Sequence, residues 1–152
     1  MTLVARDAVE AFAGLGVTAF TTTRHAGDFA VPADGPTSSI RAQWEGLLSK
    51  IDGAQRLVSS KQIHGRVVLT HDGDWTGWLR LDGADGHVTM RRGTALAVSV
   101  ADCVPVFLAH PSGIVGVLHA GWRGVVAHML DALDIDRGRA FTEPVEVPAW
   151  AT

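Results

Sequence analysis

The sequence has one cysteine, no tyrosine, no asparagine and only two lysines beside eleven arginines. One cysteine excludes an internal disulfide bond and fits a reducing compartment, so we expect a cytoplasmic protein. The longest apolar stretch, residues 95–110, is interrupted by Asp102, and no long apolar core follows a basic start at the N-terminus. The sequence therefore predicts neither a membrane span nor a signal peptide.

The composition is that of a globular protein. Hydrophobic residues make up 47% of the 152 residues and charged residues 19%, which predicts a single domain over 1–152 with a sizeable core. Thirteen basic and sixteen acidic side chains give a net charge of −3, and only Arg91 and Arg92 stand together as a basic pair. This charge pattern gives no basic footprint for nucleic acid, so we expect no nucleic-acid partner.

The pattern of apolar residues predicts an α+β fold. Apolar periodicity indicates a helix over 40–51, and the segment 121–133 is also expected to be helical. β-Branched and apolar runs predict strands, and the Gly-, Pro- and Asp-rich segments between them predict loops. The expected strands cover residues 17–23, 56–70 with a glycine break, 86–90, 94–110 and 113–120, and the expected loops cover 24–39 and 71–86. Such closely spaced strands favour a mixed sheet with helices on one side.

Three side chains with metal-binding chemistry lie in or at the ends of apolar strand segments. Cys103 lies beside Asp102 and before a proline, His119 ends the next expected strand, and His64 ends an earlier one. A short Pro-Ser-Gly turn makes the two later strands a plausible hairpin, so the thiol and one imidazole can meet. One thiolate and two imidazoles, with a fourth position open, are the ligand types of a zinc site. Their spacing matches no local zinc motif, so the pattern is suggestive only.

The same residues allow other interpretations. Cys103 and His119 could form a metal-free nucleophile–base pair, with the glycines of the turn exposing oxyanion donors. Each residue taken alone could also be an ordinary core cysteine or a structural histidine. A multicopper centre is less expected, because the seven histidines lack the paired His-X-His spacing of a trinuclear cluster.

Arginine and tryptophan side chains complete the candidate site. Arg123 lies where a helix is expected to begin, and Arg24 opens the first long loop. A guanidinium at a helix start suits a phosphate or carboxylate, so both arginines are candidate anion ligands. Trp122 could stack on an aromatic ring or simply pack between helix and sheet.

Five segments together carry a resemblance to a known family. They read FTTTRHAG (20–27), KQIHGRVV (61–68), DGADGHVT (82–89), VADCVPVFLA (100–109) and VLHAGWRGVVAHML (117–130). In this order they resemble the YfiH-like or DUF152 proteins, also labelled polyphenol oxidase or laccase-domain proteins. The resemblance covers about residues 17–133, and the tail at 134–152 diverges from the family pattern.

The resemblance implies both a fold and a chemistry. The fold would be a mixed-sheet α/β sandwich like the catalytic domain of cytotoxic necrotizing factor, shortened at the C-terminus. His64, Cys103 and His119 would bind Zn²⁺, with copper less expected, and Asp102 would orient substrate or exchange protons. Family members are described as purine nucleoside phosphorylases with adenosine deaminase activity. The implied reactions are phosphorolysis, with phosphate as co-substrate clamped by an arginine, and deamination at purine C6.

Family members normally continue well beyond the HAGWRG segment, whereas this chain leaves the pattern near residue 134. A natural short homologue, a truncated gene product and an enzyme whose pocket is completed by a second subunit would each give this pattern. A shortened sheet exposes an edge and apolar surface, so we expect a homodimer. Alternatives to a nucleoside-processing enzyme are a relative acting on another small molecule, a Cys–His hydrolase or deamidase, and a non-catalytic binding or structural protein.

Overall fold

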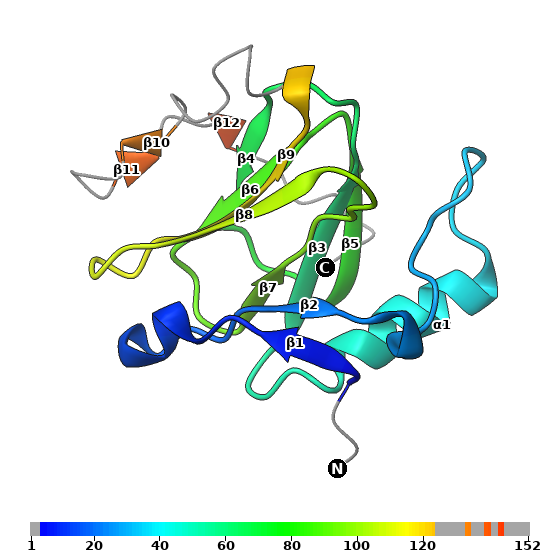
Figure 1. Ribbon diagram of the computed structural model, residues 1–152, viewed down its shortest axis with the longest axis horizontal. Helices are drawn as coiled ribbons and strands as arrows, with labels where there is room; N and C mark the ends of the chain where they lie inside the picture. Colours follow the sequence, from blue (N-terminus) through cyan, green and yellow to red (C-terminus); the bar gives the residue numbers. More distant parts are fainter. Residues whose placement is uncertain (1–3, 124–132, 135–138, 141–142, 145–152) are drawn as a thin grey trace.

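The computed structural model describes residues 4–123, together with the backbone of 133–134, 139–140 and 143–144. Strands dominate the part of the chain that the structure describes, and the helix α1 lies at its side (Figure 1). The elements in chain order are β1 (Arg6–Ala8), the 3₁₀ helix η1 (Glu10–Leu15), β2 (Phe20–Thr22), the 3₁₀ helix η2 (Arg24–Ala26), α1 (Ser38–Leu48), β3 (Arg56–Lys61), β4 (Val68–Thr70), β5 (Gly77–Asp82), β6 (Gly86–Thr89), β7 (Thr94–Leu96), β8 (Val104–Ala109), β9 (Val115–Ala120), β10 (Leu133–Asp134), β11 (Arg139–Ala140) and β12 (Glu143–Pro144).

The larger sheet has five strands in the order β12-β4-β6-β9-β8. β4 runs parallel to β6, whereas β9 is antiparallel to both β6 and β8. One face of this sheet is apolar, because Val68, Val88 and Leu118 are buried there. Gly86 makes that packing possible, since a Cβ at this position would lie 2.5 Å from a methyl carbon of Leu118.

The smaller sheet has three parallel strands in the order β5-β3-β7, and α1 packs against it (Figure 1). α1 begins where the Thr37 hydroxyl accepts a hydrogen bond from the N–H of Ile40, at 3.3 Å. The buried face of α1 places the Trp44 ring flat against Trp78 of β5, with ring centroids 5.1 Å apart. The apolar spacing predicted over 40–51 therefore produces the expected packing.

The mixed-sheet α+β prediction is confirmed, but two expected elements differ. The strand expected over 94–110 is wrong: β7 pairs with β3 in one sheet, β8 pairs with β9 in the other, and residues 97–103 cross between them. The segment 71–86, expected to be a loop, contains the strand β5. The glycines and aspartates around β5 favoured turns, and its apolar residues do not follow a clear alternating pattern. Trp122 and Arg123 have helical backbone, and the rest of the helix expected over 121–133 lies outside the described residues.

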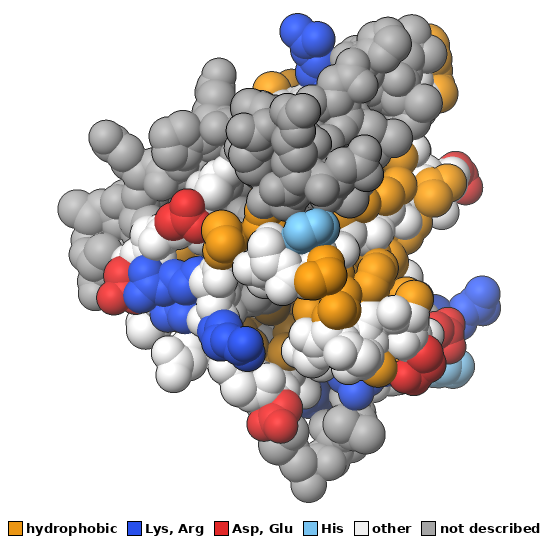
Figure 2. Space-filling model, turned by 90° about the vertical axis from the view of Figure 1, so that its left-hand side faces the viewer, with side chains coloured by type: hydrophobic (Ala, Val, Ile, Leu, Met, Phe, Trp, Pro, Cys, Tyr) orange, Lys and Arg blue, Asp and Glu red, His pale blue; other side chains and the backbone are white. Residues whose placement is uncertain are grey.

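Among the described residues, no helix is long and apolar enough to cross a bilayer. On the face seen in Figure 2, hydrophobic side chains reach the surface near the centre, and Lys and Arg side chains group beside them. Exposed apolar side chains include Met90, Val104 and Trp122. The expected homodimer stays a prediction.

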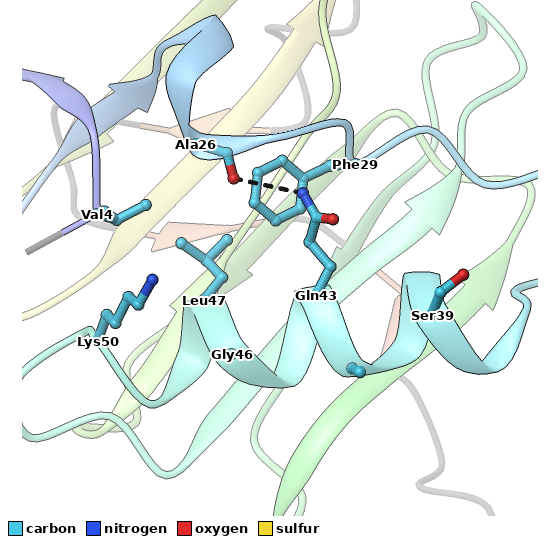
Figure 3. A pocket seen from close by; sticks show the side chains of 9 residues that line it. Val4, Ala26, Phe29, Ser39, Gln43, Gly46, Leu47 and Lys50 are labelled. Carbon is cyan, nitrogen blue, oxygen red and sulfur yellow. Dashed lines mark hydrogen bonds between the residues drawn. The ribbon is translucent and has the colours of Figure 1, made fainter. Parts of the chain in front are cut away.

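A groove of about 380 Å³ lies between the N-terminal segment and α1 (Figure 3). Phe29, Leu47 and Val4 form its apolar wall, and Lys50 lies at its edge. The Gln43 amide donates a hydrogen bond to the carbonyl of Ala26, at 3.4 Å, which holds the loop over α1. None of the metal-binding candidates lines this groove.

Two buried histidines form a hydrogen-bonded pair inside the larger sheet. His71 Nε2 lies 2.8 Å from His87 Nδ1, and both side chains are almost fully buried. Burial lowers the pKa of His71 to about 4. Burial, together with the neighbouring His71, lowers the pKa of His87 to about 3. Both imidazoles are therefore neutral in the folded protein at neutral pH.

This pair predicts acid sensitivity. Because both folded-state pKa values lie below the unfolded value of 6.5, the unfolded chain takes up protons first, and stability is lost as the pH falls below 6.5. Between about pH 6 and pH 5 the unfolded chain binds roughly 1.5 to 1.9 more protons at these two histidines, so we expect the free energy of unfolding to fall by about 2–2.5 kcal/mol per pH unit. Urea titrations across this range measure the slope. His87→Gln removes one titrating group and should reduce it, whereas His25→Gln at an exposed position should not; equal slopes in all three proteins would contradict the assignment.

Candidate metal centre

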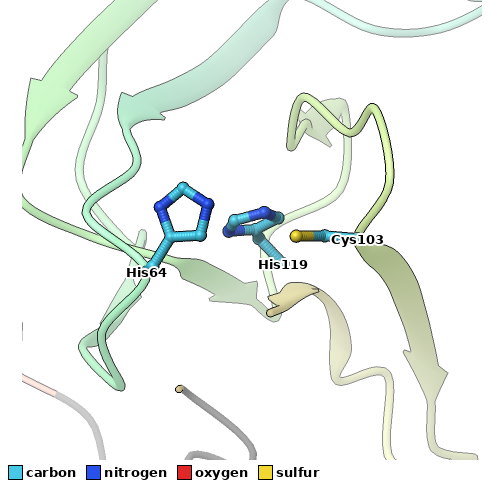
Figure 4. Close-up of side chains that lie close together, drawn as sticks. All are labelled: His64, Cys103 and His119. Carbon is cyan, nitrogen blue, oxygen red and sulfur yellow. The ribbon is translucent and has the colours of Figure 1, made fainter. Parts of the chain in front are cut away.

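The three predicted metal ligands come together in the folded chain. One ligand atom each from His64, Cys103 and His119 lies within 4.8 Å of the other two. Figure 4 shows the His119 ring between the His64 ring and the Cys103 sulfur. The two imidazoles meet edge to face, with ring centroids 4.8 Å apart. Three separate segments carry the ligands: His64 lies in the turn after β3, Cys103 in the loop before β8, and His119 in β9.

The β8–β9 hairpin places the thiol beside one imidazole. Pro105 pairs with His119 and Val104 with Ala120, so Cys103 immediately precedes the paired part of β8. His119 lies in β9, which ends at Ala120, directly before Gly121. The hairpin predicted from the Pro-Ser-Gly turn is therefore confirmed, and its register brings sulfur and imidazole to the same sheet end.

His64 lies in a tight turn that wraps around a buried carboxylate. Its φ is +57°, in the left-handed region that side chains other than glycine rarely adopt. The N–H groups of Ile63, His64 and Gly65 all donate to the carboxylate of Asp85, at 3.2, 2.9 and 2.9 Å. Successive N–H groups in such turns converge on anions, so these hydrogen bonds offset the cost of the backbone conformation.

The same carboxylate contacts His119. Asp85 Oδ1 lies 2.8 Å from His119 Nδ1, and the Asp85 carbonyl accepts from the His119 N–H at 2.7 Å. The Asp85 side chain is completely buried. Burial alone would raise its pKa, but the hydrogen bonds from His119 and from the Gly65, Ile63 and His64 N–H groups outweigh burial and lower the pKa. Asp85 is therefore a carboxylate at neutral pH.

A side-chain amide joins the His64 turn to the segment that leads to Cys103. Gln62 Nε2 donates to the Ser99 carbonyl, and Gln62 Oε1 accepts from the Ser99 N–H, both at 2.7 Å. This two-bond bridge mimics a strand pairing between the turn and the 97–103 crossing. The loops that carry His64 and Cys103 are thereby tied together.

Gly121 provides the space in which the three ligands meet. A Cβ at this position would lie 3.2 Å from His64 Cδ2, 3.5 Å from Cys103 Sγ and 3.8 Å from His119 Cε1. The residue is buried, and its φ is not in the left-handed region. The glycine is therefore required by the close approach of the ligands and not by backbone conformation.

The donor set fits a zinc ion. Three ligands at tetrahedral zinc stand about 3.3–3.6 Å apart, given zinc–nitrogen and zinc–sulfur distances of roughly 2.0–2.3 Å. The three ligand atoms lie within 4.8 Å of one another, so a bound ion would draw them closer together. Because His119 Nδ1 faces Asp85, its Nε2 remains for a metal. The chemistry and the spacing of the donors are therefore compatible with a metal centre.

The other predicted site residues are arranged around the cluster to different degrees. Asp102 is exposed in the bend before β8, beside Cys103. Trp122 and Arg123 follow Gly121 and are exposed, with the Arg123 guanidinium 5.3 Å from the Trp122 ring centroid. Arg24 lies in η2, between β2 and α1, in a part of Figure 1 away from the end of β9. Arg24 is thus not brought to the cluster, and its anion-binding role stays a prediction.

The sequence pattern did not predict the roles of Asp85 and Gln62. Both belong to segments already quoted as motifs, DGADGHVT and KQIHGRVV, but their side chains were assigned no role. The available signal was an aspartate directly before the short strand expected over 86–90, where a buried carboxylate would need partners. Three apolar residues that adjoin the ligand segments in sequence are exposed: Ile63 by 54%, Val104 by 60% and Trp122 by 73%.

Comparisons with known proteins agree with this architecture. The sequence model of the family described as multi-copper polyphenol oxidoreductase laccase matches residues 20–150. YlmD from Geobacillus stearothermophilus superposes with a TM-score of 0.58 at 26% identity, over 74% of this chain and 46% of that chain. A DUF152 protein of Neisseria meningitidis gives a TM-score of 0.53 at 26% identity, over 68% and 41% of the two chains. The fold is therefore that of the YfiH-like proteins.

Curated relatives carry nucleoside-processing names. A purine nucleoside phosphorylase of Streptomyces griseus is 48% identical over 77 residues, which make up 50% of this chain and 31% of that protein. An adenosine deaminase from an unknown prokaryotic organism is 46% identical over 54 residues, 35% of this chain and 21% of that protein. The matched part of this chain thus spans about a third or less of these relatives.

Filling the space at Gly121 should weaken metal binding without unfolding the protein. In Gly121→Ala the new methyl group displaces the His64 ring, and we expect zinc affinity to fall on the order of tenfold. Competition with a chromophoric chelator measures the affinity, and thermal unfolding reports the fold. Gly46→Ala is the matched control, because a Cβ there meets nothing within 4 Å. Equal affinity in Gly121→Ala and the wild type would show that the metal lies elsewhere.

Proposed function

This chain belongs to the multi-copper polyphenol oxidoreductase laccase family, and we propose that it is a zinc-dependent enzyme that processes purine nucleosides. The reactions we assign to it are phosphorolysis, deamination or both, on adenosine-type nucleosides. The observation that carries the proposal is the convergence of one thiol and two imidazoles at the end of the β8–β9 hairpin. The names of the relatives in Streptomyces griseus and the unknown prokaryote support the substrate class.

The donor set favours zinc. Thiolate and imidazole ligands suit Zn²⁺, and a catalytic zinc site keeps three protein ligands with one position open. His64, Cys103 and His119 supply those three ligands, and the exposure of His64 leaves the cluster accessible. A zinc ion held there would supply Lewis acidity for reactions at the purine ring or at the ribose.

The residues around the cluster supply binding and proton transfer in the proposal. Ile63, Val104 and Trp122 offer apolar surface on which a purine ring can lie. Arg123 binds phosphate, the co-substrate of phosphorolysis, because a guanidinium fork matches its oxygens. Asp102, exposed beside Cys103, orients substrate or exchanges protons with it. A short relative acting on another small molecule would use the same groups.

A second candidate uses the same side chains without a metal. The Cys103 sulfur lies in the same cluster as the His119 ring, so the pair could act as nucleophile and base of a hydrolase or deamidase. In this case the Asp85 carboxylate would orient the base through its hydrogen bond with His119 Nδ1, and His119 Nε2 would take the thiol proton. This arrangement is the alternative against which the zinc proposal is tested.

Metal content and activity test the proposal together. We expect about one zinc ion per chain in protein purified without a histidine tag, and loss of that zinc in Cys103→Ala. The loaded protein should convert adenosine or inosine, with phosphate accelerating release of the base, and Cys103→Ala should be inactive. Elemental analysis and chromatography of the products measure both. Metal-free protein with a readily alkylated Cys103 would instead support the thiol hydrolase. An inert, metal-free thiol would favour a non-catalytic binding or structural protein.

The role of Arg123 can be separated from that of the metal ligands. Loss of a charge-assisted hydrogen bond to phosphate costs about 1.5 kcal/mol or more, so we expect Arg123→Ala to raise the KM for phosphate at least about tenfold. Zinc content should not change. Arg92→Ala, at an exposed position near the start of β7, is the control and should leave the KM unchanged. Steady-state kinetics at varied phosphate decides, and an unaltered KM in Arg123→Ala would remove this arginine from the phosphate site.

A further inference from the structure

One buried carboxylate contacts both histidines of the cluster. Asp85 Oδ1 lies within hydrogen-bond distance of the His64 N–H and of His119 Nδ1. Oδ2 accepts from the N–H groups of Ile63 and Gly65. Each oxygen therefore has two donors, and the side chain has no exposed surface. No part of this carboxylate is free to contact a substrate.

The contact with His119 determines which ring nitrogen carries the proton. A carboxylate accepts hydrogen bonds, so Nδ1 must be the protonated nitrogen of a neutral His119 ring. The lone pair that can bind a metal is then on Nε2. Without this partner, a neutral imidazole exchanges between two tautomers, and one of them has no free electron pair at Nε2.

The contacts with the turn determine where the other imidazole lies. Three successive N–H groups point at Asp85, and the middle one belongs to His64, whose φ is +57°. Such a backbone conformation persists only where the surroundings hold it. Removing the carboxylate leaves three N–H groups without their acceptor and releases the turn that aims the His64 ring.

We propose that Asp85 is the positioning residue of the metal centre, holding His119 in its Nδ1–H tautomer and holding the His64 turn in its left-handed conformation. Both imidazoles are thereby directed at the point that Cys103 also faces. This inference rests on the proposed metal-binding function for its consequence, but the tautomer and the turn can be measured without a metal.

Asparagine is the most informative replacement because it cannot satisfy both sides of the carboxylate. If the amide oxygen faces His119, its NH₂ group meets the N–H groups of Ile63 and Gly65, donor against donor. If the amide is reversed, its NH₂ donates to His119 Nδ1, and a neutral ring must carry its proton on Nε2, where a metal would bind. Asp85→Asn therefore disrupts either the turn or the tautomer while keeping the volume of the side chain.

Two measurements on the full chain test the inference. The first is zinc affinity, by competition with a chromophoric chelator, for which we expect Asp85→Asn to bind about 10–100 times more weakly than the wild type. The second is the ¹⁵N spectrum of the His119 ring in metal-free protein, expected to show Nδ1–H in the wild type and a changed tautomer or mixture in the variant, or a displaced His64 amide signal. Asp82→Asn makes the same chemical change at an exposed carboxylate and should match the wild type in both.

The outcomes distinguish this inference from the proposed function. A wild type that binds no zinc would refute the metal-dependent function, and the ring nitrogen spectrum would still decide the role of Asp85. If the wild type binds zinc and Asp85→Asn binds it within about twofold, with ring and turn signals unchanged, Asp85 is not a positioning residue. If Asp85→Asn unfolds, Asp85→Glu, which keeps the acceptor but moves it, replaces it in both measurements under the same criteria.

Discussion

The whole centre depends on the burial of one charge. A carboxylate removed from water is costly unless every lone pair finds a donor, and in this fold Asp85 finds four, from the His64 turn and from His119. To supply these donors, the turn after β3 and the end of β9 must both lie against Asp85, the residue directly before β6. Segments far apart in the sequence are thereby held in one place, and two of them carry the imidazoles.

The five-stranded sheet separates packing from chemistry by its two faces. Side chains alternate along a strand, so Val88 and Leu118 fill the apolar face while their neighbours His87, Val117 and His119 project from the other. Since Asp85 contacts His119, its carboxylate also lies on that second side. The apolar face contributes hydrophobic stabilisation, and the second face, which carries Val117 as well, holds the ionisable groups that would weaken an ordinary core.

The sequence was informative where chemistry and local periodicity coincide. The spacing of apolar residues predicted α1, and the short turn predicted the β8–β9 hairpin that unites Cys103 with His119. What the sequence alone could not provide depends on pairing over long distances. The apolar run 94–110 is divided between two sheets because its first part pairs with β3 and its last part pairs with β9. The role of Asp85 likewise depends on which turn folds over it, and no local pattern encodes that partner.

The name of the family points to several coppers, but the arrangement of the histidines that the structure describes favours a single centre. A multicopper oxidase needs imidazoles free to converge on several ions. Among the residues the structure describes, His71 and His87 are hydrogen-bonded to each other, and His110 is bonded to Ser112. The described part of the chain offers one group of three donors, His64, Cys103 and His119, and in it the imidazole of His119 is oriented by a carboxylate. If this centre holds zinc, as proposed, the ion would supply Lewis acidity and no redox chemistry, which nucleoside phosphorolysis and deamination can use and phenol oxidation cannot.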